Sequence, residues 1–383
     1  MALPAVEGFQ KEFGSAPRVV TRAPGRLEIL GNHTDYNEGV VLSTAVDRST
    51  WVAAAPADTD ECVVKDVRDE SVRRFRADAL DNPEKGDWAN YIKGIVVELQ
   101  QRGIEVPPFQ ATLYSTVPMS AGMSSSAAME MSFCFALGRL AGADLPWLEW
   151  ARIGQGAENN YVGAKTGLMD QFSSLKGMPN QLVFSDFRSL EVRNVPLPEG
   201  TALVVANSKV KHELTNEYNE RRERCEEAVE FLQHRYEGIS ALRDVSRAQL
   251  DACKEDMDIL VYRRALHVVG ENERVFAGSE ALKAGDLDTF GKLMVESQAS
   301  SRDNFENSCR ELDILVDLGR SLPGFIGARL SGGGFGGITV HLVRRDEAES
   351  YAKRLGTAYK SRTDIDPETM ICQAGPGAEV IRG

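Results

Sequence analysis

Three consecutive serines stand in a segment whose pattern suits the binding of a phosphate group. Residues 117–128 read Val-Pro-Met-Ser-Ala-Gly-Met-Ser-Ser-Ser-Ala-Ala, between a run of β-forming residues and a helix-forming run at 129–140. Ser124, Ser125 and Ser126 therefore fall where a helix is predicted to begin, and there unpaired backbone N–H groups and the helix dipole attract an anion. The segment matches neither a Walker loop nor a dinucleotide loop. The alternative is a serine cap on an ordinary helix, which needs no ligand.

A second segment, 22–42, carries many hydrogen-bonding side chains on a predicted strand and turn. Within ten residues it places five such groups, bracketed by glycines. They are Arg26, Glu28, Asn32, His33 and Asp35. A dense cluster of donors and acceptors suits a polyhydroxylated ligand, because such a ligand presents many hydroxyls and little apolar surface. A solvated polar turn between two strands would have the same composition.

Two further segments have compositions that suit an active site. Asp170 follows the turn from Gly163 to Gly167 and precedes hydroxyl residues, which suits a carboxylate near a reacting hydroxyl, although a helix cap is equally compatible. Residues 332–337 contain five glycines in six positions. That many glycines cost chain entropy, so the segment is expected to approach another loop or a ligand closely.

The segments that must position these groups form a mixed α/β pattern. Apolar alternation predicts strands, and a helical apolar period with glycine stops predicts helices. The predicted strands are 18–21, 50–55, 62–67, 111–117, 183–194 and 201–206. The predicted helices are 88–102, 129–140, 148–161, 217–234, 258–277 and 287–300. We expect one domain over residues 1–195 and a second over residues 196–383.

The composition argues against several classes of protein. The 383 residues are 42% apolar and 26% charged, which is ordinary for a globular chain of two or three domains. A net charge of −13 argues against a surface built for nucleic acid or an anionic membrane. Six scattered cysteines form no Cys-x-x-Cys pair, which indicates reduced thiols. No signal-peptide pattern and no membrane-spanning apolar run is present, so a cytoplasmic location is expected.

Taken together, the three glycine-containing segments resemble the three motifs of the GHMP small-molecule kinases. The first, with Pro24-Gly-Arg26 and His33-Thr-Asp35-Tyr-Asn37, resembles the galactokinase signature. Residues 118–128 resemble the phosphate loop, and residues 331–337 resemble the third motif. The resemblance extends to shorter segments along nearly the whole chain. These are Trp88-Ala-Asn-Tyr, Gly167-Leu-Met-Asp-Gln, Asn216-Glu-Tyr218 with Arg221-Arg222, Arg264-Ala-Leu-His-Val-Val-Gly, and Cys309-Arg-Glu-Leu-Asp.

The resemblance implies an ATP-dependent kinase for the anomeric hydroxyl of a sugar, with D-galactose as the first candidate. Asp170 would contact that hydroxyl as base or orienter, and Arg26 would stabilise the charge that develops during transfer. The implied sugar-binding residues are Asn32, His33, Asp35, Gly167, Asp170 and Tyr218. The implied nucleotide-binding residues are Trp88, Ser120, Ala121, Gly122, Met123, Ser124, Ser125 and Ser126. Ser125 and Glu158 match ligands of Mg²⁺, which prefers hard oxygen donors.

The resemblance also implies a fold of two α/β lobes. The N-terminal lobe would be of ribosomal-S5-like type and the C-terminal lobe ferredoxin-like, with the active site between them. The last strand of the chain could return to the N-terminal lobe, and a monomer is implied. Trp88 stands at the start of a predicted helix, where simple packing is the alternative to contact with a base.

One position departs from the galactokinase pattern. Galactokinases usually have Gly-Glu-His-Thr-Asp where this chain has Gly31-Asn-His-Thr-Asp35, and Glu28 stands where asparagine is usual. In galactokinases the missing glutamate accepts a hydrogen bond from the 6-hydroxyl of the sugar. A neutral replacement is therefore expected to weaken the binding of galactose about tenfold, and Asn32→Glu is expected to tighten that binding. Glu28 is a candidate substitute, but positions four apart on a straight strand are separated by about 13 Å.

The departure leaves other substrates and functions open. The loss of a carboxylate removes a repulsion against a sugar acid, so galacturonate is an alternative, as are N-acetylgalactosamine, a 6-deoxy sugar and a pentose. A sugar sensor without turnover is a further alternative, but Arg26, Asp170 and the intact serines favour an enzyme. An unrelated two-domain enzyme does not explain the number of matching segments.

Overall fold

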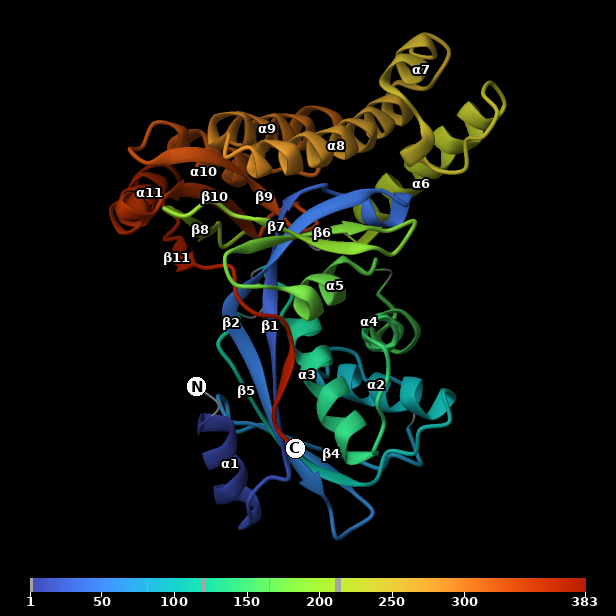
Figure 1. Ribbon diagram of the computed structural model, residues 1–383, viewed down its shortest axis with the longest axis vertical. Helices are drawn as coiled ribbons and strands as arrows, with labels where there is room; N and C mark the ends of the chain where they lie inside the picture. The colour runs from blue at the N-terminus through green and yellow to red at the C-terminus, as the bar shows by residue number, and fades with distance from the viewer. Residues whose placement is uncertain (1–2, 81, 119–121, 165, 211–214) are drawn as a thin grey trace.

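The computed structural model describes residues 3–80, 82–118, 122–164, 166–210 and 215–383, with the side chains of 215–218 excepted. These residues form two sheets with helices packed against them (Figure 1). None of the described helices is long and apolar enough to cross a membrane.

The larger sheet is built around a long hairpin of β1 (Val19–Leu30) and β2 (Val40–Pro56). The two strands pair antiparallel, with irregularities between Pro24 and Arg26 and between Glu28 and Leu30. The described strands of this sheet run in the order β12-β1-β2-β5-β3-β4, and β6 pairs with both β2 and β7. They include β3 (Cys62–Asp66), β4 (Val72–Phe75), β5 (Phe109–Ser115), β6 (Gln181–Asp186), β7 (Val192–Pro196) and β12 (Glu379–Arg382). Because β12 pairs with β1, the end of the chain returns to this sheet (Figure 1).

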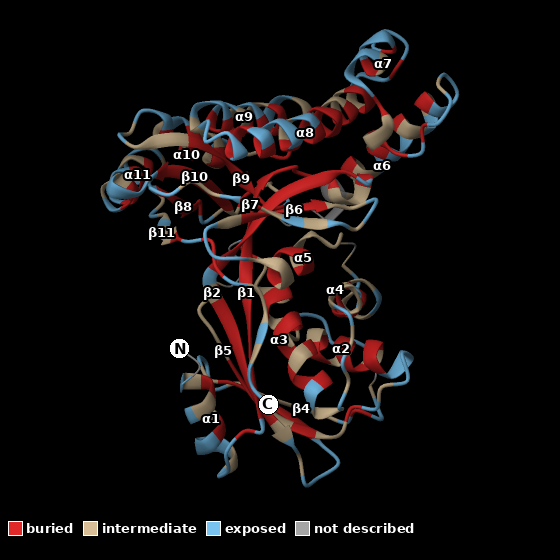
Figure 2. Ribbon diagram, viewed as in Figure 1, coloured by how far each residue is buried: buried red, intermediate tan, exposed pale blue. Residues whose placement is uncertain are grey.

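Helices cover both faces of the larger sheet. The apolar side chains of Val52 and Ala54 join a core with α2 (Ala89–Gln101), α3 (Ser125–Leu140) and α4 (Trp147–Gly156). The alternate residues Trp51 and Ala53 pack instead against α1 (Leu3–Phe13). Successive side chains of a strand point to opposite faces, so a strand covered on both faces is apolar throughout. The inner surfaces are accordingly buried, and the outer faces of the helices are exposed (Figure 2).

The smaller sheet is antiparallel, with the described strands in the order β11-β8-β10-β9. One apolar core, which includes Leu27, Leu42, Val205, Val275 and Val340, joins the two sheets. The strands of the smaller sheet are β8 (Thr201–Asn207), β9 (Phe325–Ser331), β10 (Ile338–Arg344) and β11 (Glu368–Cys372). The helices near it are α8 (Ile259–Lys283), α9 (Leu287–Ser300), α10 (Arg310–Arg320) and α11 (Ala348–Thr363).

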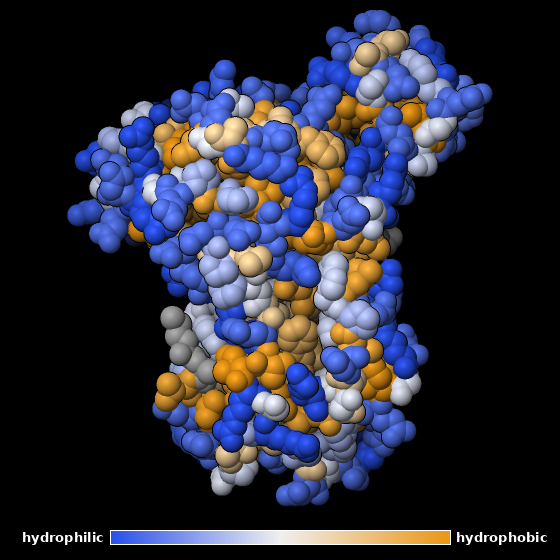
Figure 3. Space-filling model, viewed as in Figure 1, coloured by the Kyte–Doolittle hydropathy of each residue, from blue (hydrophilic) through white to orange (hydrophobic). Residues whose placement is uncertain are grey.

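A helical arm projects from the upper right of the molecule in Figure 1. It contains α6 (Thr215–Gln233), α7 (Arg247–Ala252), the 3₁₀ turn η3 (Leu242–Asp244) and the first turns of α8. Its inner apolar cluster, with Leu232, Leu250 and Val261, is separate from the two larger cores. Its outer surface is mainly hydrophilic (Figure 3).

Most of the predicted elements are confirmed, and five differ. The strand predicted at 50–55 begins earlier, at Val40, because the chain already pairs there with β1 and β6. The strand predicted at 18–21 continues to Leu30, because a bulge at Gly25 lets the chain pass through Pro24 without ending the strand. The segment 183–194 is two strands, and the helix predicted at 148–161 changes at its end into a wider π turn, η2 (Ala157–Val162). The helix predicted at 258–277 extends to Lys283. The chain changes sheets between β7 and β8, and the proposed division at 195/196 stays a prediction.

Candidate active site

A polar cavity of about 170 Å³ lies where the two sheets meet. Its walls come from β1 and the turn after it, from α5 (Met169–Lys176) with the segment before it, and from the loop between β9 and β10. The lining residues are Arg26, Glu28, Asn32, His33, Asp35, Thr166, Gly167, Met169, Asp170, Gly332 and Gly333. The first and third glycine-containing segments of the sequence therefore meet at one cavity.

An ion pair between Arg26 and Asp170 stands in the wall of this cavity. The distance between Nε of Arg26 and Oδ1 of Asp170 is 2.7 Å, and the two side chains are 7% and 18% exposed. The other carboxylate oxygen accepts a hydrogen bond from the hydroxyl of Ser124. Nη1 of Arg26 donates to the carbonyl of Gly122 at 2.6 Å. Strand β1, α5 and the serine segment are thus joined through two charged side chains.

The bulge in β1 brings the backbone against the serine segment. The N–H of Arg26 donates to the carbonyl of Met123 at 3.0 Å. A Cβ on Gly25 would lie 2.7 Å from that carbonyl oxygen, so only glycine permits the approach. The strand that carries Arg26 is therefore fixed to the loop that carries Ser124.

Glu28 and Asn32 are in direct contact. The expectation from a straight strand, that the two residues lie about 13 Å apart, is therefore wrong. Nδ2 of Asn32 donates to Oε1 of Glu28 at 2.9 Å. The strand ends at Leu30, and the chain turns at Gly31, whose φ is 99°. The N–H groups of Gly31 and Asn32 both donate to the buried carboxylate of Glu271 at 2.9 Å, which holds the turn.

His33 is a neutral side chain held at both ring nitrogens. Nε2 donates to the carbonyl of Gly333 at 3.0 Å, so Nδ1 accepts from the hydroxyl of Tyr36 at 2.8 Å. Burial lowers the pKa of His33 to about 4. The histidine thus connects the β1 turn to the glycine loop and carries no charge near neutral pH.

Asp35 faces the cavity beside Gly167. Burial, and after it the nearby charge of Glu28, raises the pKa of Asp35 to about 7. A Cβ on Gly167 would collide with Oδ2 of Asp35. The absence of a side chain at position 167 therefore determines how closely this carboxylate approaches the segment before α5.

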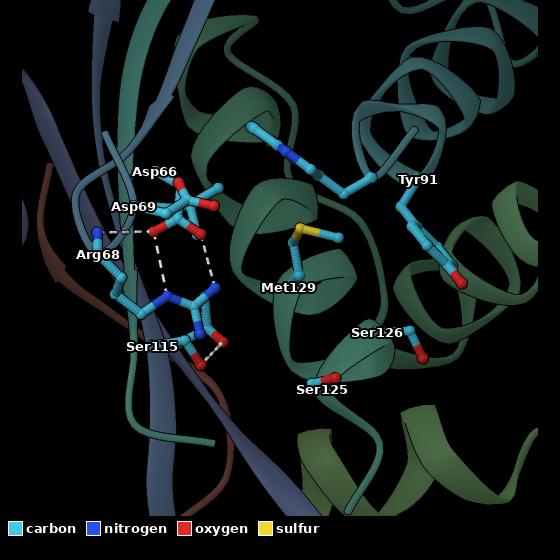
Figure 4. Close-up of a pocket in the computed structure, with 11 residues that line it drawn as sticks. Asp66, Arg68, Asp69, Tyr91, Ser115, Ser125, Ser126 and Met129 are labelled. Carbon is cyan, nitrogen blue, oxygen red and sulfur yellow. Dashed lines mark hydrogen bonds and ion pairs between the residues drawn. The ribbon is translucent and has the colours of Figure 1, made fainter. Parts of the chain in front are cut away.

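A second cavity of about 260 Å³ lies beside the start of α3 (Figure 4). Ser125 and Ser126, at the start of α3, line it, whereas Ser124 contacts Asp170 of the first cavity. The other lining residues are Thr50, Asp66, Arg68, Asp69, Trp88, Tyr91, Leu113, Ser115 and Met129. In Figure 4 the guanidinium of Arg68 is paired with the carboxylate of Asp66. The serines therefore stand between a polar cavity and a partly apolar one.

Glu158 is a buried carboxylate close to both cavities. Its Oε2 accepts a hydrogen bond from the hydroxyl of Thr166 at 2.9 Å. Burial, and after it the charge of Asp170, raises the pKa of Glu158, while hydrogen bonds from Thr166 and Ser126 oppose that rise. Within the described part of the chain, no group of three His, Cys, Asp or Glu side chains is arranged to hold a metal ion. A divalent cation here would depend on Glu158, hydroxyls and a ligand's own oxygens.

The other predicted residues differ in whether the structure describes them and in what they contact. Ser120 and Ala121 lie outside the described residues, as does the side chain of Tyr218. Trp88 lines the second cavity and also lies under the guanidinium of Arg73, 5.4 Å from its ring centre. Sequence reasoning missed Thr166 in the cavity wall and Arg329 behind it. The signal for Arg329 was a lone charge within an apolar strand, since a buried charge needs a partner.

Comparison with known proteins identifies the family. The galactokinase galactose-binding signature matches residues 7–56, the N-terminal domain of GHMP kinases matches 90–178, and their C-terminal domain matches 279–361. The galactokinase of Roseiflexus sp. (strain RS-1) is 42% identical over 97% of this chain and 95% of its own length. The chain belongs to the galactokinase family.

A further galactokinase sequence and a solved galactokinase structure support the same family. The galactokinase of Haemophilus influenzae (strain KW20 / Rd) is 39% identical over 97% of both chains. The crystal structure of Lactococcus lactis galactokinase complexed with galactose matches with a TM-score of 0.93 and 30% identity, over 98% of both chains. A mevalonate kinase structure matches with a TM-score of 0.65 at 18% identity, which shows the shared fold alone.

These matches confirm the predicted family and fold class. The chain has the GHMP kinase fold, with an N-terminal and a C-terminal domain. It is therefore a sugar kinase of the type that transfers phosphate from ATP.

Proposed function

We propose that the protein transfers the γ-phosphate of ATP to the anomeric hydroxyl of D-galactose, giving galactose 1-phosphate and ADP. The observation that carries this proposal is the ion pair of 2.7 Å between Arg26 and Asp170, in a polar cavity and in contact with Ser124. Similarity over the full length to galactokinases, one of them in complex with galactose, supports galactose as the sugar.

In the proposed reaction, Asp170 accepts the proton of the anomeric hydroxyl while the oxygen of that hydroxyl forms a bond to the γ-phosphorus. The bond from that phosphorus to the oxygen bridging the β-phosphate breaks, and ADP leaves with the electron pair. Arg26, held between Asp170 and the carbonyl of Gly122, places a positive charge beside the transferring group. Both side chains are fixed before the sugar binds, so little reorganisation is needed at the moment of transfer.

The second cavity is the proposed nucleotide site. Its apolar part, with Trp88, Tyr91 and Met129, suits the base, and Ser125 and Ser126 at the N-terminus of α3 suit the phosphates. Gly122, Met123 and Ser124, with Ser120 and Ala121, complete the proposed phosphate loop. Because Ser124 contacts Asp170, this loop would place the γ-phosphate beside the sugar.

Ser125 and Glu158 are the proposed protein ligands of Mg²⁺. Hydroxyl and carboxylate oxygens are the donors that Mg²⁺ prefers, and such sites commonly use one or two protein oxygens with phosphate oxygens and water. The raised pKa of the Glu158 carboxyl fits this role, because a nearby dication would favour its ionised form. When bound, Mg²⁺ would neutralise charge on the phosphates.

The charges of the first cavity disfavour galacturonate. Three carboxylates line it, from Glu28, Asp35 and Asp170, and among the described lining residues the only permanent cation is Arg26, which is paired with Asp170. Arg329, behind the wall, is likewise paired with Glu28, so neither arginine is left to pair with a sugar carboxylate. His33, Asp35, Gly167 and Tyr218 are the proposed residues that hold the neutral sugar.

We also propose a monomer in the cytoplasm, as the resemblance and the sequence pattern implied. The six free cysteines, five of them buried, are compatible with a reducing compartment.

The test is ADP release with ATP and magnesium across galactose, galacturonate, N-acetylgalactosamine, talose, fucose and arabinose. Galactose should give the highest kcat/KM, and ³¹P NMR should show the phosphate on the anomeric oxygen. A higher kcat/KM for galacturonate would contradict the proposed substrate. Binding of galactose and ATP without ADP release would instead indicate a sensor.

A further inference from the structure

We propose that Glu28 is the specificity residue that accepts a hydrogen bond from a non-anomeric hydroxyl of the sugar, and that Asn32 only positions it. The proposal rests on the proposed function, because it assigns a role within the same cavity. It replaces the assignment of Asn32 as a direct sugar ligand.

The two carboxylate oxygens of Glu28 differ in their partners among the residues that the structure describes. The side chain is almost fully buried yet lines the cavity wall. Nη1 of Arg329 donates to Oε1 at 2.7 Å, and Nδ2 of Asn32 donates to the same oxygen at 2.9 Å. Within the described part of the chain, no hydrogen bond reaches Oε2. A carboxylate oxygen in a cavity needs a donor, and a sugar hydroxyl supplies one.

Both N–H groups of the Asn32 amide are used inside the protein. Its two N–H groups donate to Oε1 of Glu28 and to the carbonyl of Gly332, each at 2.9 Å. Its Oδ1 accepts from Nδ2 of Asn307 at 2.8 Å. These three partners fix which end of the amide faces Glu28 and leave no N–H for a sugar.

The backbone holds Glu28 independently of the ligand. Its N–H donates to the hydroxyl of Ser331 at 2.9 Å, so β1 is joined to the start of the glycine loop. Arg329, which pairs with the Glu28 side chain, is two residues earlier on β9 and is fully buried. The carboxylate is therefore fixed by the smaller sheet as well as by its own strand, which is the preorganisation that a specificity contact needs.

Glu28 and Arg26 lie two positions apart on β1 and line the same cavity. Arg26 pairs with Asp170, which is proposed to meet the anomeric hydroxyl, and Glu28 lies about 7 Å further along the strand. A sugar that places its anomeric hydroxyl at Asp170 would therefore offer a different hydroxyl to Glu28.

The first test measures KM and kcat by ADP release for galactose and its 2-, 3-, 4- and 6-deoxy derivatives, in the wild type and in Glu28→Gln. Glu28→Gln should raise the KM for galactose about tenfold with a smaller change in kcat, because a charged acceptor is replaced by a neutral one. At least one deoxy sugar should have the same KM in both proteins, and we expect this for 6-deoxygalactose. An equal penalty for every sugar, or no penalty for galactose, would overturn the proposal.

Arg329 has two buried nitrogens without partners in the described chain, so Glu28→Gln could unfold the protein. Two further comparisons remain decisive in that case. The wild type alone should bind one deoxygalactose about tenfold more weakly than galactose, and equal binding of all four would contradict the proposal. The double variant Glu28→Asn, Asn32→Glu exchanges the two side chains and so keeps one carboxylate and one amide in the pair. Its KM for galactose should be close to that of the wild type. Absence of ADP release with galactose in the wild type would reject the proposed function itself.

Discussion

Nδ2 of Asn32 lies 2.9 Å from Oε1 of Glu28, although four positions separate the two residues along the chain. The contact exists because β1 ends between them and the chain reverses at Gly31. A Cβ on Gly31 would lie 2.5 Å from the carbonyl oxygen of Val40, so the reversal requires glycine. The cavity therefore keeps a carboxylate that the comparison of motifs alone had counted as lost.

Asn32→Glu should weaken the binding of galactose, whereas the sequence alone predicted tighter binding. The new carboxylate would face that of Glu28 at hydrogen-bonding distance and would lose the donors to Glu28 and Gly332. We expect a loss of about 1–3 kcal/mol in stability and a raised KM for galactose. Thermal unfolding and ADP release measure the two effects. Asn194→Glu, in β7 away from the cavity, is the matched control and should leave the KM unchanged. A lower KM in Asn32→Glu would contradict the arrangement.

Gly167→Ala should impair the sugar site without unfolding the protein. The new methyl group would collide with the carboxylate of Asp35 and displace it. Displacing a binding group by about 1 Å can cost up to about a hundredfold in rate, so kcat/KM for galactose should fall by tenfold or more. Gly356→Ala, where the added Cβ meets only ordinary contacts, should have no such effect. Equal kinetics in the two variants would mean that Asp35 does not contact the sugar.

The raised pKa of Asp35 gives a pH dependence of stability with a definite sign. The pKa is about 7 in the folded protein and 3.8 without the environment of the fold. Between these values the folded state holds a proton that the unfolded chain has released, so this group's contribution to the free energy of unfolding falls as pH rises from about 4 to 7. Urea unfolding at pH 5 and pH 7.5 should show a smaller pH effect in Asp35→Asn than in the wild type. An unchanged pH effect would place the pKa of Asp35 near its ordinary value.

Local sequence patterns were sufficient for the serine segment. The helix that follows it begins at Ser125, where the helix-forming run and the serines predicted a start. Ser124 does not cap this helix through its side chain, because its hydroxyl donates to Asp170 instead. Asp170 and Arg26, which the motif resemblance related to each other as catalytic residues, line one cavity and are in contact across 144 positions of the chain, while their catalytic role stays a prediction.

Other parts of the site depend on tertiary contacts that no local pattern reports. Arg329 pairs with Glu28 across two sheets, and its strand shows only an isolated charge. The division of the serines between two cavities follows from the bulge at Gly25, which brings β1 against Met123. A bulge adds no distinctive residue pattern beyond a glycine, so its effect on Arg26 and Ser124 required the structure.

The most direct test of the proposed function compares kcat for galactose in the wild type, Asp170→Asn and Asp366→Asn. Asp366 forms an exposed ion pair with Lys360 and serves as the control. Loss of a positioned proton acceptor should lower kcat of Asp170→Asn by about 10²–10⁴-fold, while Asp366→Asn should match the wild type. Galactose binding, measured by calorimetry, should persist in all three proteins. A kcat in Asp170→Asn close to that of the wild type would contradict the assignment of this cavity as the site of phosphoryl transfer.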